Sequence, residues 1–552
     1  MSHYSSTTKM LDKMSSKDRD YRFMAVSDLL SDFGRDEFPT DSDSHRKISR
    51  KILQLLNDSS TEVQGLAFRC LAPLALKIEP SLVSEMIDHL TKDLLAVNAS
   101  SDLPMLGLKS LVTEIPVENP VSSHVAKQSM PALLNGLMRP DLPEDIRLDC
   151  LELLNEVLLC SSSVLVEYHQ RTKDALLPYI ESTRPITRKR AVQCLSALSA
   201  GCSSEIFGQI MAHIEICCSS NSKTENATAA LQLVGAISRQ CAYRLVDTLD
   251  TLMQILVSHS RETFEDNCEL HEACLFILEC LLPRYGQDLG NYKSSIIELI
   301  NRSMRYDPNY VGDDDDEMNN LEEDAEDNGS EAEYSDEGDD YSDDDDQSWK
   351  VRRAAVKCAQ AVFLCRVPEL RYLQFELSQS IIRRLSEHEE SVKVEVYAAI
   401  DSLLNILLDA EVGRTAAGDP MESSDNFKES LSESVKSQVS LIINRSRTDL
   451  AGRSFKLRLG SLTVLKTLFT VLPYANDEVV KSLVPKLKVA LTDSNADIRF
   501  AILGLLKAFV MYVRPPLESI KLVSQAFPFI LNEADNKYYK SSTESFHLFT
   551  LI

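Results

Sequence analysis

The sequence of 552 residues contains little glycine, a single tryptophan and no long apolar run. Its 17 glycines are about 3% of the chain, well below the ~7% of average proteins, as expected for a mostly helical chain with few special turns. No stretch reaches the ~18 apolar residues that cross a membrane. The first residues, MSHYSSTTKM, have no apolar core of signal-peptide length. We therefore expect a cytoplasmic and nuclear protein without membrane partners.

The 13 cysteines include no CxxC pair, and the adjacent Cys217 and Cys218 are the one close spacing. The spacing typical of zinc and redox sites is therefore missing. Several cysteines lie among apolar residues at helical spacing, where a small apolar thiol packs well; these are Cys70, Cys150, Cys194, Cys274 and Cys358. We interpret them as structural thiols in a reducing compartment, and we predict no metal ion and no cofactor.

The sequence also lacks the motifs GxxxxGK[ST], GxGxxG, HExxH and GxSxG, so it has no phosphate cradle, zinc pair or nucleophile elbow. The ten histidines are scattered singly, and we interpret His271, beside Glu272, as a surface or core residue of a helix. The net charge of −26 repels phosphate. We expect neither an enzyme with catalytic residues nor a nucleic-acid-binding protein.

A five-residue pattern returns through the whole chain: an apolar residue, a basic or polar one, two variable ones, and a small or apolar one. The copies end at Ala25, Ala67, Gly107, Cys150, Ala191, Leu231, Cys274, Ala355, Val396, Ser461, Ile502 and Thr543. Most intervals lie between 40 and 43 residues, with two of 81 and 65. A period near 41 is typical of HEAT and armadillo repeats. We predict an all-α, HEAT-type solenoid of about 12 units, forming a curved superhelix.

Each repeat contains two stretches with helical apolar spacing. One stretch consists of Val63, Leu66, Ala67, Cys70, Leu71 and Leu74, and the other of Ile48, Ile52, Leu53, Leu55 and Leu56. Such spacing marks one buried face of a helix. The polar residues 57–60 separate the two stretches as turn and capping residues. Each unit is therefore predicted to be a helix hairpin that buries its apolar faces against its neighbours.

The two long intervals contain insertions. The tract 313–346 holds 20 Asp or Glu among 34 residues and no Lys or Arg, and a polar stretch precedes residue 434. The predicted organisation is HEAT repeats in 1–305, an acidic disordered insertion in 306–348, HEAT repeats in 349–408, a polar loop insertion in 409–433, and terminal HEAT repeats in 434–552. Because apolar, periodic sequence flanks the acidic tract on both sides, the tract is predicted to interrupt one continuous architecture.

Three roles of the acidic tract remain open. It can act as a solubilising spacer, or it can compete for a basic partner surface and speed encounter. It also carries candidate phosphorylation sites at Ser330, Ser335 and Ser342, each followed by acidic residues.

The second position of the repeat pattern is Arg or Lys in eight of the twelve copies: Arg22, Arg147, Arg188, Arg352, Lys393, Arg458, Arg499 and Lys540. Acidic turn residues precede several of them, as Asp493 and Asp497 precede Arg499. A row of this kind could bind a partner, but charge-assisted bonds at stacked turns favour a structural ladder between repeats.

The densest basic cluster is TRPITRKR, residues 183–190. It is either a solvated turn or a contact for an acidic protein surface. The candidate partner-contact residues are Arg184, Arg188, Lys189, Arg190, Trp349, Arg352 and Arg353.

Five segments together resemble a known family. They are KDRDYRFMAVSDLL (17–30), EVQGLAFRCLAPLA (62–75), AISRQ (236–240), YDPNY (306–310) and DDDDQSWKVRRAAVKC (343–358). The last two are the most specific, because a generic helical repeat requires neither. The sequence resembles the cullin-associated, neddylation-dissociated proteins over all 552 residues, but it matches only the N-terminal half of that family's usual chain.

The resemblance implies a helical HEAT solenoid that wraps an unneddylated cullin with its RING subunit. In the family, the N-terminal repeats cover the acceptor lysine of the cullin, and the C-terminal repeats displace the substrate adaptor. The implied function is a non-catalytic scaffold that regulates ubiquitin-ligase assembly, neddylation and substrate-receptor exchange. The alternative is an importin-type nuclear transport receptor, since such receptors are also acidic HEAT solenoids with an acidic loop and bind a small GTPase.

The last repeat, YKSSTESFHLFTLI, ends in apolar residues, among them Phe546, Phe549 and Ile552. Because terminal repeats of solenoids require a polar outer face, we expect further repeats to stack near Ile552. These would belong to a longer chain or to a separate C-terminal half, and we predict the separate half if the chain is complete.

Overall fold

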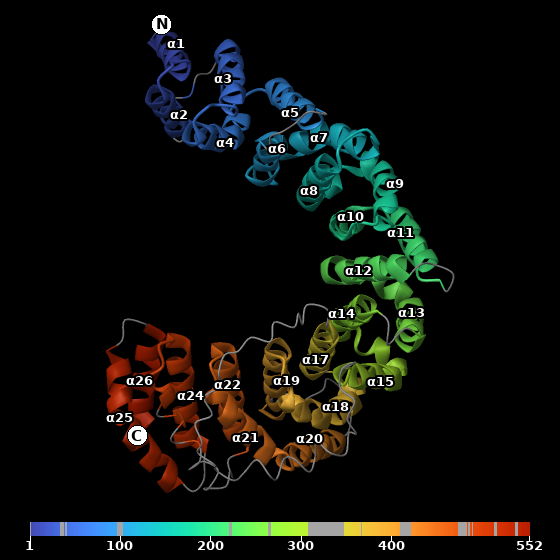
Figure 1. Cartoon of the computed structure of the whole chain (residues 1–552), viewed down its shortest axis with the longest axis vertical. Helices are drawn as coiled ribbons and strands as arrows, with labels where there is room; N and C mark the ends of the chain where they lie inside the picture. Colours follow the sequence, from blue (N-terminus) through green and yellow to red (C-terminus); the bar gives the residue numbers. More distant parts are fainter. Residues whose placement is uncertain are drawn as a thin grey trace, which may run out of the picture. The chain divides into compact units, whose positions relative to one another are not determined.

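The computed structural model describes residues 2–33, 38, 41–96, 103–219, 224–262, 267–306, 347–365, 367–408, 421–472, 483, 486–487, 489–512, 516–535 and 539–551. All regular elements within these ranges are α-helices or short 3-10 helices (Figure 1). They form two compact units, Met1–Val246 and Asp247–Ile552. None of the helices in these ranges is both long and apolar enough to span a bilayer.

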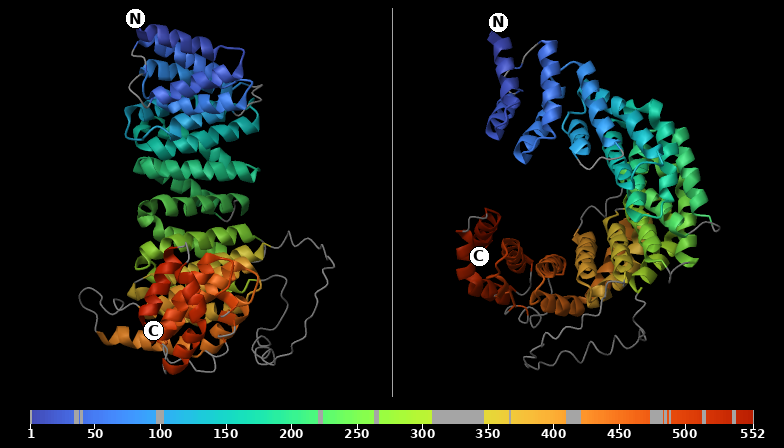
Figure 2. Two further views of the ribbon diagram at one scale, coloured as in Figure 1. Left: turned by 90° about the vertical axis from the view of Figure 1, so that its left-hand side faces the viewer. Right: turned by 45° about the horizontal axis from the view of Figure 1, so that its top comes forward.

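The first unit contains twelve of the described α-helices: α1 (Ser2–Met14), α2 (Arg19–Phe33), α3 (Ser42–Leu55), α4 (Thr61–Ala75), α5 (Pro80–Leu94), α6 (Leu103–Thr113), α7 (Pro120–Met138), α8 (Glu144–Ser161), α9 (His169–Ile180), α10 (Pro185–Gly201), α11 (Ser204–Cys217) and α12 (Thr224–Cys241). The 3-10 helices η1 (Ser162–Val164) and η2 (Val166–Tyr168) connect α8 to α9, and η3 (Ala242–Thr248) follows α12. In Figure 2 the helices of this unit lie in successive layers.

The second unit contains α13 (Leu249–Glu262), α14 (Cys268–Tyr285), α15 (Lys293–Met304), α17 (Ser348–Leu364), α18 (Arg371–Arg383), α19 (Glu390–Leu408), α20 (Met421–Lys436), α21 (Val439–Leu450), α22 (Phe455–Val471), α24 (Ala496–Tyr512), α25 (Pro516–Ala534) and α26 (Tyr539–Leu551). Its 3-10 helices are η4 (Asp288–Tyr292), η6 (Pro368–Leu370) and η7 (Arg384–Ser386).

The repeat pattern marks the start of one helix in each pair. Within the described ranges, every copy of the five-residue pattern lies in the first eight residues of a different helix, from α2 to α26. The predicted hairpin of residues 48–74 is present as α3 and α4, and residues 57–60 connect these helices. The structure therefore confirms the predicted HEAT-type stack of helix pairs.

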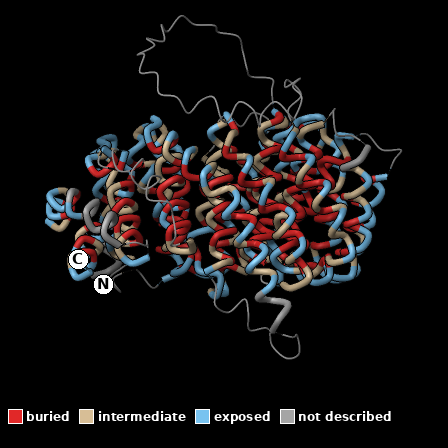
Figure 3. Tube along the Cα trace, turned by 90° about the horizontal axis from the view of Figure 1, so that it is seen from below, coloured by how far each residue is buried: buried red, intermediate tan, exposed pale blue. Residues whose placement is uncertain are grey.

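Facing sides of the helices carry the buried residues, as the tube coloured by burial shows (Figure 3). Among the residues predicted for the first apolar face, Val63, Ala67 and Leu74 are fully buried. The five cysteines predicted to be structural thiols are all fully buried, and all 13 cysteines are free. Burial raises the pKa of Cys70 and of Cys150 to about 12, so these thiols are protonated and pack as small apolar groups.

Helices on either side of the acidic tract pack directly against each other. The thiol of Cys358 in α17 donates to the carbonyl oxygen of Leu275 in α14 at 2.8 Å. Seven residues further on, Cys365 donates to the carbonyl oxygen of Leu282 at 3.2 Å. The tract between α15 and α17 thus interrupts a continuous stack, as predicted. The whole tract 313–346, including the three candidate phosphorylation sites, lies outside the described residues.

The second predicted insertion is partly helical. Residues 409–420 lie outside the described residues, but α20 begins at Met421 and runs through the rest of the segment predicted as a polar loop. Leu431 and Val435 of α20 are fully buried, because apolar residues four apart share one face of a helix. The loop prediction is therefore corrected for residues 421–433.

Candidate functional site

In several repeats the basic residue at the second position of the pattern is a structural clamp. In α2, the guanidinium of Arg22 donates from Nε and Nη2 to the two carboxylate oxygens of Asp58, each at 2.7 Å. Its Nη1 donates to the carbonyl oxygens of Ser16 and Lys17, both at 3.0 Å. Asp58 also accepts from the backbone N–H of Ser60 at 2.8 Å. One arginine therefore joins the turn of its own repeat to the turn of the next.

This geometry recurs in the second unit. Arg458 pairs with Asp493 at 3.1 Å, and its Nη1 donates to the carbonyl oxygens of Gly452 and Arg453, each at 2.9 Å. Arg499 pairs with Glu533 at 2.9 Å and donates to the carbonyl oxygen of Asp493 at 2.6 Å. These contacts confirm the predicted ladder between repeats.

The clamp also sets the protonation of its carboxylates. The hydrogen bond from Arg22 lowers the pKa of Asp58, although burial alone would raise it. Burial likewise tends to raise the pKa of Glu387, but Arg384 and Arg352 hold it below its ordinary value. Both carboxylates are therefore charged at neutral pH, which keeps the guanidinium contacts charge-assisted.

Arg352, predicted both as a ladder residue and as a candidate partner contact, lies inside the stack. Only 6% of its surface is exposed. Its Nε donates to Glu387 at 3.1 Å, and its Nη1 donates to the carbonyl oxygen of Tyr306 at 3.1 Å and to Ser348 Oγ at 2.8 Å. This burial favours the ladder role of Arg352 over a role in partner contact.

The neighbouring candidates Arg353 and Trp349 lie nearer the surface. Arg353 donates to Glu395 on α19 at 3.0 Å and keeps 41% of its side chain exposed. Trp349 is half-buried, and the Lys350 ammonium lies 5.8 Å from its ring centroid. Arg353 is therefore half of an ion pair between repeats.

The basic cluster of residues 183–190 is mostly helical, because α10 begins at Pro185. Arg184 pairs with Glu144 at 2.9 Å, and Arg188 donates to the carbonyl oxygen of Ser182 at 2.8 Å. Most residues of the cluster are exposed, as a solvated segment requires, but the prediction of a turn is corrected: most of the cluster is the first two turns of α10.

Arg190 and Lys109 share a carboxylate within the first unit. Arg190 pairs with Glu152 at 2.9 Å, and Lys109 of α6 pairs with the same residue at 2.6 Å. Lys189 is exposed and forms no ion pair with any residue that the structure describes. Among the predicted contact residues of this cluster, Lys189 is therefore the cation most available to a partner.

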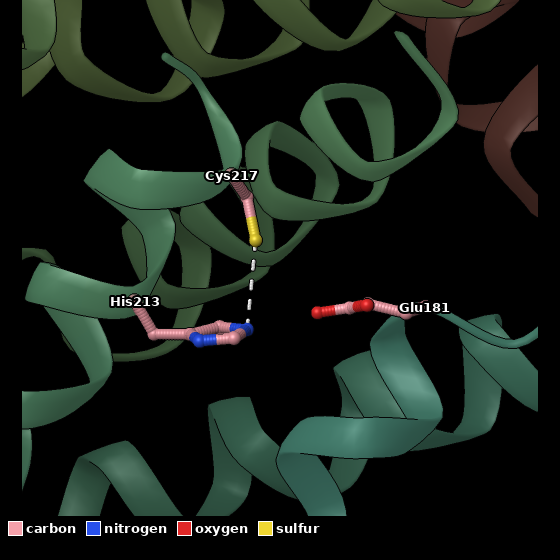
Figure 4. Close-up of side chains that lie close together, drawn as sticks. All are labelled: Glu181, His213 and Cys217. Atoms are coloured by element: carbon pink, nitrogen blue, oxygen red, sulfur yellow. Dashed lines mark hydrogen bonds between the residues drawn. The ribbon is translucent and has the colours of Figure 1, made fainter. Parts of the chain in front are cut away.

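A cluster of three potential metal ligands was not predicted from the sequence. Glu181 follows α9, and His213 and Cys217 lie on α11; their ligand atoms are all within 4.8 Å of one another (Figure 4). Burial and the nearby carboxylate of Glu181 raise the pKa of Cys217. The spacing of His213 and Cys217, four residues apart, was visible in the sequence, but nothing in it indicates that Glu181 joins them.

His271, in α14, is part of the packed core. His271 is 1% exposed, and its Nδ1 lies 3.1 Å from the carbonyl oxygen of Asn267. Of the two positions that the sequence left open, the surface or the core of a helix, the structure shows the core.

No protein-family model matches the chain. Curated relatives match it almost from end to end. The cullin-associated NEDD8-dissociated protein 1 of Drosophila melanogaster is 30% identical over 547 residues, which are 98% of this chain and 42% of the relative. The protein of the same name from Arabidopsis thaliana is 30% identical over 97% of this chain and 43% of the relative. The chain belongs to the family of cullin-associated NEDD8-dissociated proteins.

This member of the cullin-associated NEDD8-dissociated protein family spans about two fifths of the length of these relatives. A shorter relative, from Emericella nidulans, is named "Cullin-associated NEDD8-dissociated protein 1, N-terminal part"; it is 23% identical over 48% of this chain and 87% of its own length. The family resemblance found in the sequence is therefore confirmed.

Solved structures support the fold of this family member. A crystal structure of importin beta matches 99% of the chain and 62% of its own length, with a TM-score of 0.60 and 12% identity. A structure of Kap95p with RanGDP matches 99% of the chain and 67% of its own length, with a TM-score of 0.51 and 10% identity. At these identities the likeness shows the helical-repeat fold alone.

Proposed function

We propose that the chain is a non-catalytic scaffold that binds an unneddylated cullin together with its RING subunit. The observation that carries the proposal is the 30% identity, over 98% of the chain, to proteins named for their association with cullins. The stack of helix pairs supports it, because repeat units present extended surfaces to large protein partners.

The mechanism we propose is steric. The chain would cover the acceptor lysine of the cullin and so oppose neddylation, while leaving the substrate adaptor in place. The adaptor-displacing repeats of the family lie beyond the part that this chain resembles. We expect the purified chain to slow cullin neddylation in a reconstituted reaction without releasing adaptor. Complete release of adaptor by this chain alone would contradict the steric mechanism.

A second polypeptide of the same family is the further partner we propose. Helix α26 exposes Tyr539, Phe546 and Leu551, with exposed fractions of 70%, 58% and 41%. Stacked repeats bury such side chains, and the existence of a relative named as an N-terminal part supports two separate halves. Co-elution of the chain with a candidate C-terminal half on size exclusion tests this partner; separate elution, with the chain soluble and monomeric, would count against it.

A pull-down tests the central function. The immobilised chain is offered an unneddylated cullin-RING complex and, in parallel, a small GTPase loaded with GTP. We expect retention of the cullin complex and no retention of the GTPase. Retention of the GTPase alone would replace the proposal with the importin-type alternative. The proposal also places the chain in the cytoplasm and nucleus, which fluorescence microscopy of a tagged chain can test.

A further inference from the structure

Three side chains of different ligand type converge between two neighbouring helices of the first unit. His213 and Cys217 are one turn apart on α11, so they project from the same face of this helix. Glu181 follows Ile180, the last residue of α9, and points toward them (Figure 4). His213 Nε2 lies 3.5 Å from Cys217 Sγ, and all three ligand atoms lie within 4.8 Å of one another.

Glu181 departs from the ladder that several other repeats build. Arg499 pairs with Glu533, which lies 34 residues later in the sequence. Glu181 stands at the same separation from Arg147, yet the two form no ion pair within the described part of the chain, and Arg147 Nε is buried without a hydrogen-bond partner. The carboxylate of Glu181 is thus directed toward α11 instead of the preceding repeat.

The separation of the nitrogen and the sulfur suits a tetrahedral zinc ion. With Zn–S near 2.3 Å and Zn–N near 2.0–2.1 Å, the tetrahedral angle places the two ligand atoms roughly 3.5 Å apart. A thiolate and an imidazole favour zinc over magnesium or calcium. We propose that Glu181, His213 and Cys217 bind a zinc ion, with water as the fourth ligand.

The ion would join two consecutive repeats. Its ligands come from the end of α9 and from the last two turns of α11, which are the first helices of two consecutive pairs. On binding, the Cys217 thiol releases its proton to solvent and coordinates as a thiolate. Because the unfolded chain does not hold the three ligands together, the ion would stabilise the folded first unit.

Cobalt titration of the purified full chain under reducing conditions tests the site, because a thiolate bound to Co²⁺ gives a charge-transfer absorption in the near ultraviolet. We expect this band to saturate at one equivalent of Co²⁺ and to disappear when Zn²⁺ is added. Cys217→Ser should abolish the band, and His213→Ala should weaken Co²⁺ binding by more than about tenfold. Zn²⁺ should raise the melting temperature of the wild-type chain but not that of Cys217→Ser.

Cys218→Ser is the matched control, because Cys218 is the adjacent cysteine and is also buried. This variant should keep the cobalt band, and circular dichroism should show that all variants fold. Absence of the band in the wild-type chain, or its persistence in Cys217→Ser, would overturn the zinc site. Cullin retention in the pull-down is a separate readout, so failure of the zinc site leaves the proposed function standing.

Discussion

At the scale of single residues, the arginine of the repeat pattern makes contacts in two directions. Arg22 binds the carbonyl oxygens at the end of the turn before α2 and the carboxylate of Asp58 in the next turn. The carbonyl oxygens of Ser16 and Lys17 lie in the turn between α1 and α2, outside the hydrogen bonding of either helix, and backbone carbonyls held away from water need a hydrogen-bond partner. A single side chain therefore supplies hydrogen bonds to the turn carbonyls of one repeat and fixes the position of the next repeat.

Replacement of Asp58 tests the strength of this contact. Asp58→Asn removes the charge that Arg22 pairs with, so we expect a loss of about 1.5–3 kcal/mol in the free energy of unfolding at pH 7. Urea titration followed by circular dichroism measures the loss.

The same variant tests the direction of the pH dependence. The pKa of Asp58 is lowered in the folded chain, so its contribution to stability is present above the ordinary carboxyl pKa of about 3.9. The contribution is lost as the pH falls through the lowered value. The difference between wild type and Asp58→Asn should therefore close below pH ~4. A difference that stays constant down to pH 3 would argue against the charged pair.

Two basic residues should respond differently to substitution. Lys189→Glu should change the free energy of unfolding by less than about 0.5 kcal/mol, because the side chain is exposed. It should nevertheless slow association with a cullin complex severalfold and weaken the salt dependence of the association rate. Arg352→Gln should instead cost about 1.5–3 kcal/mol of stability, because it breaks a buried charged hydrogen bond. Stopped-flow association rates and urea titrations measure the two effects. An unchanged association rate for Lys189→Glu would remove this residue from the partner-binding surface.

At the scale of elements, the sequence predicted what is local and periodic. The five-residue pattern identified the starts of helices from α2 to α26 because each copy carries the apolar spacing of a helix face. Helix α20 was missed because Phe427, Leu431 and Val435 give only one apolar residue per turn in an otherwise polar segment. The sequence predicted that basic residues of the pattern pair with acidic turn residues. It did not predict that Glu181 approaches α11, because this depends on how α9 and α11 pack, which periodicity does not encode.

Replacement by alanine should have opposite effects on stability at two helical glycines. A Cβ at Gly65 in α4 meets no heavy atom within 4 Å, whereas a Cβ at Gly460 in α22 lies 3.0 Å from Cβ and 3.2 Å from Cγ of the buried Tyr397. Gly65→Ala should therefore stabilise the chain by about 0.5–1 kcal/mol, and Gly460→Ala should destabilise it by about 1–3 kcal/mol. Urea titration of both variants tests the packing of α19 against α22; stabilisation by Gly460→Ala would contradict it.

At the scale of the whole molecule, two units of stacked helix pairs provide a scaffold. The direct packing of α14 on α17 shows that the acidic tract leaves the stack of the second unit continuous. Family membership, and not the fold, points to cullins, because importin beta shares the fold at only 12% identity. Binding of a cullin therefore has to be measured directly.

The most direct measurement is the dissociation constant of the chain for a cullin-RING complex before and after its modification by NEDD8. If the chain covers the acceptor lysine, NEDD8 on that lysine must clash with it. We predict that the unmodified complex binds at least about tenfold more tightly, a difference of about 1.4 kcal/mol. Equal affinity for the two forms, or no binding to either, would contradict the account.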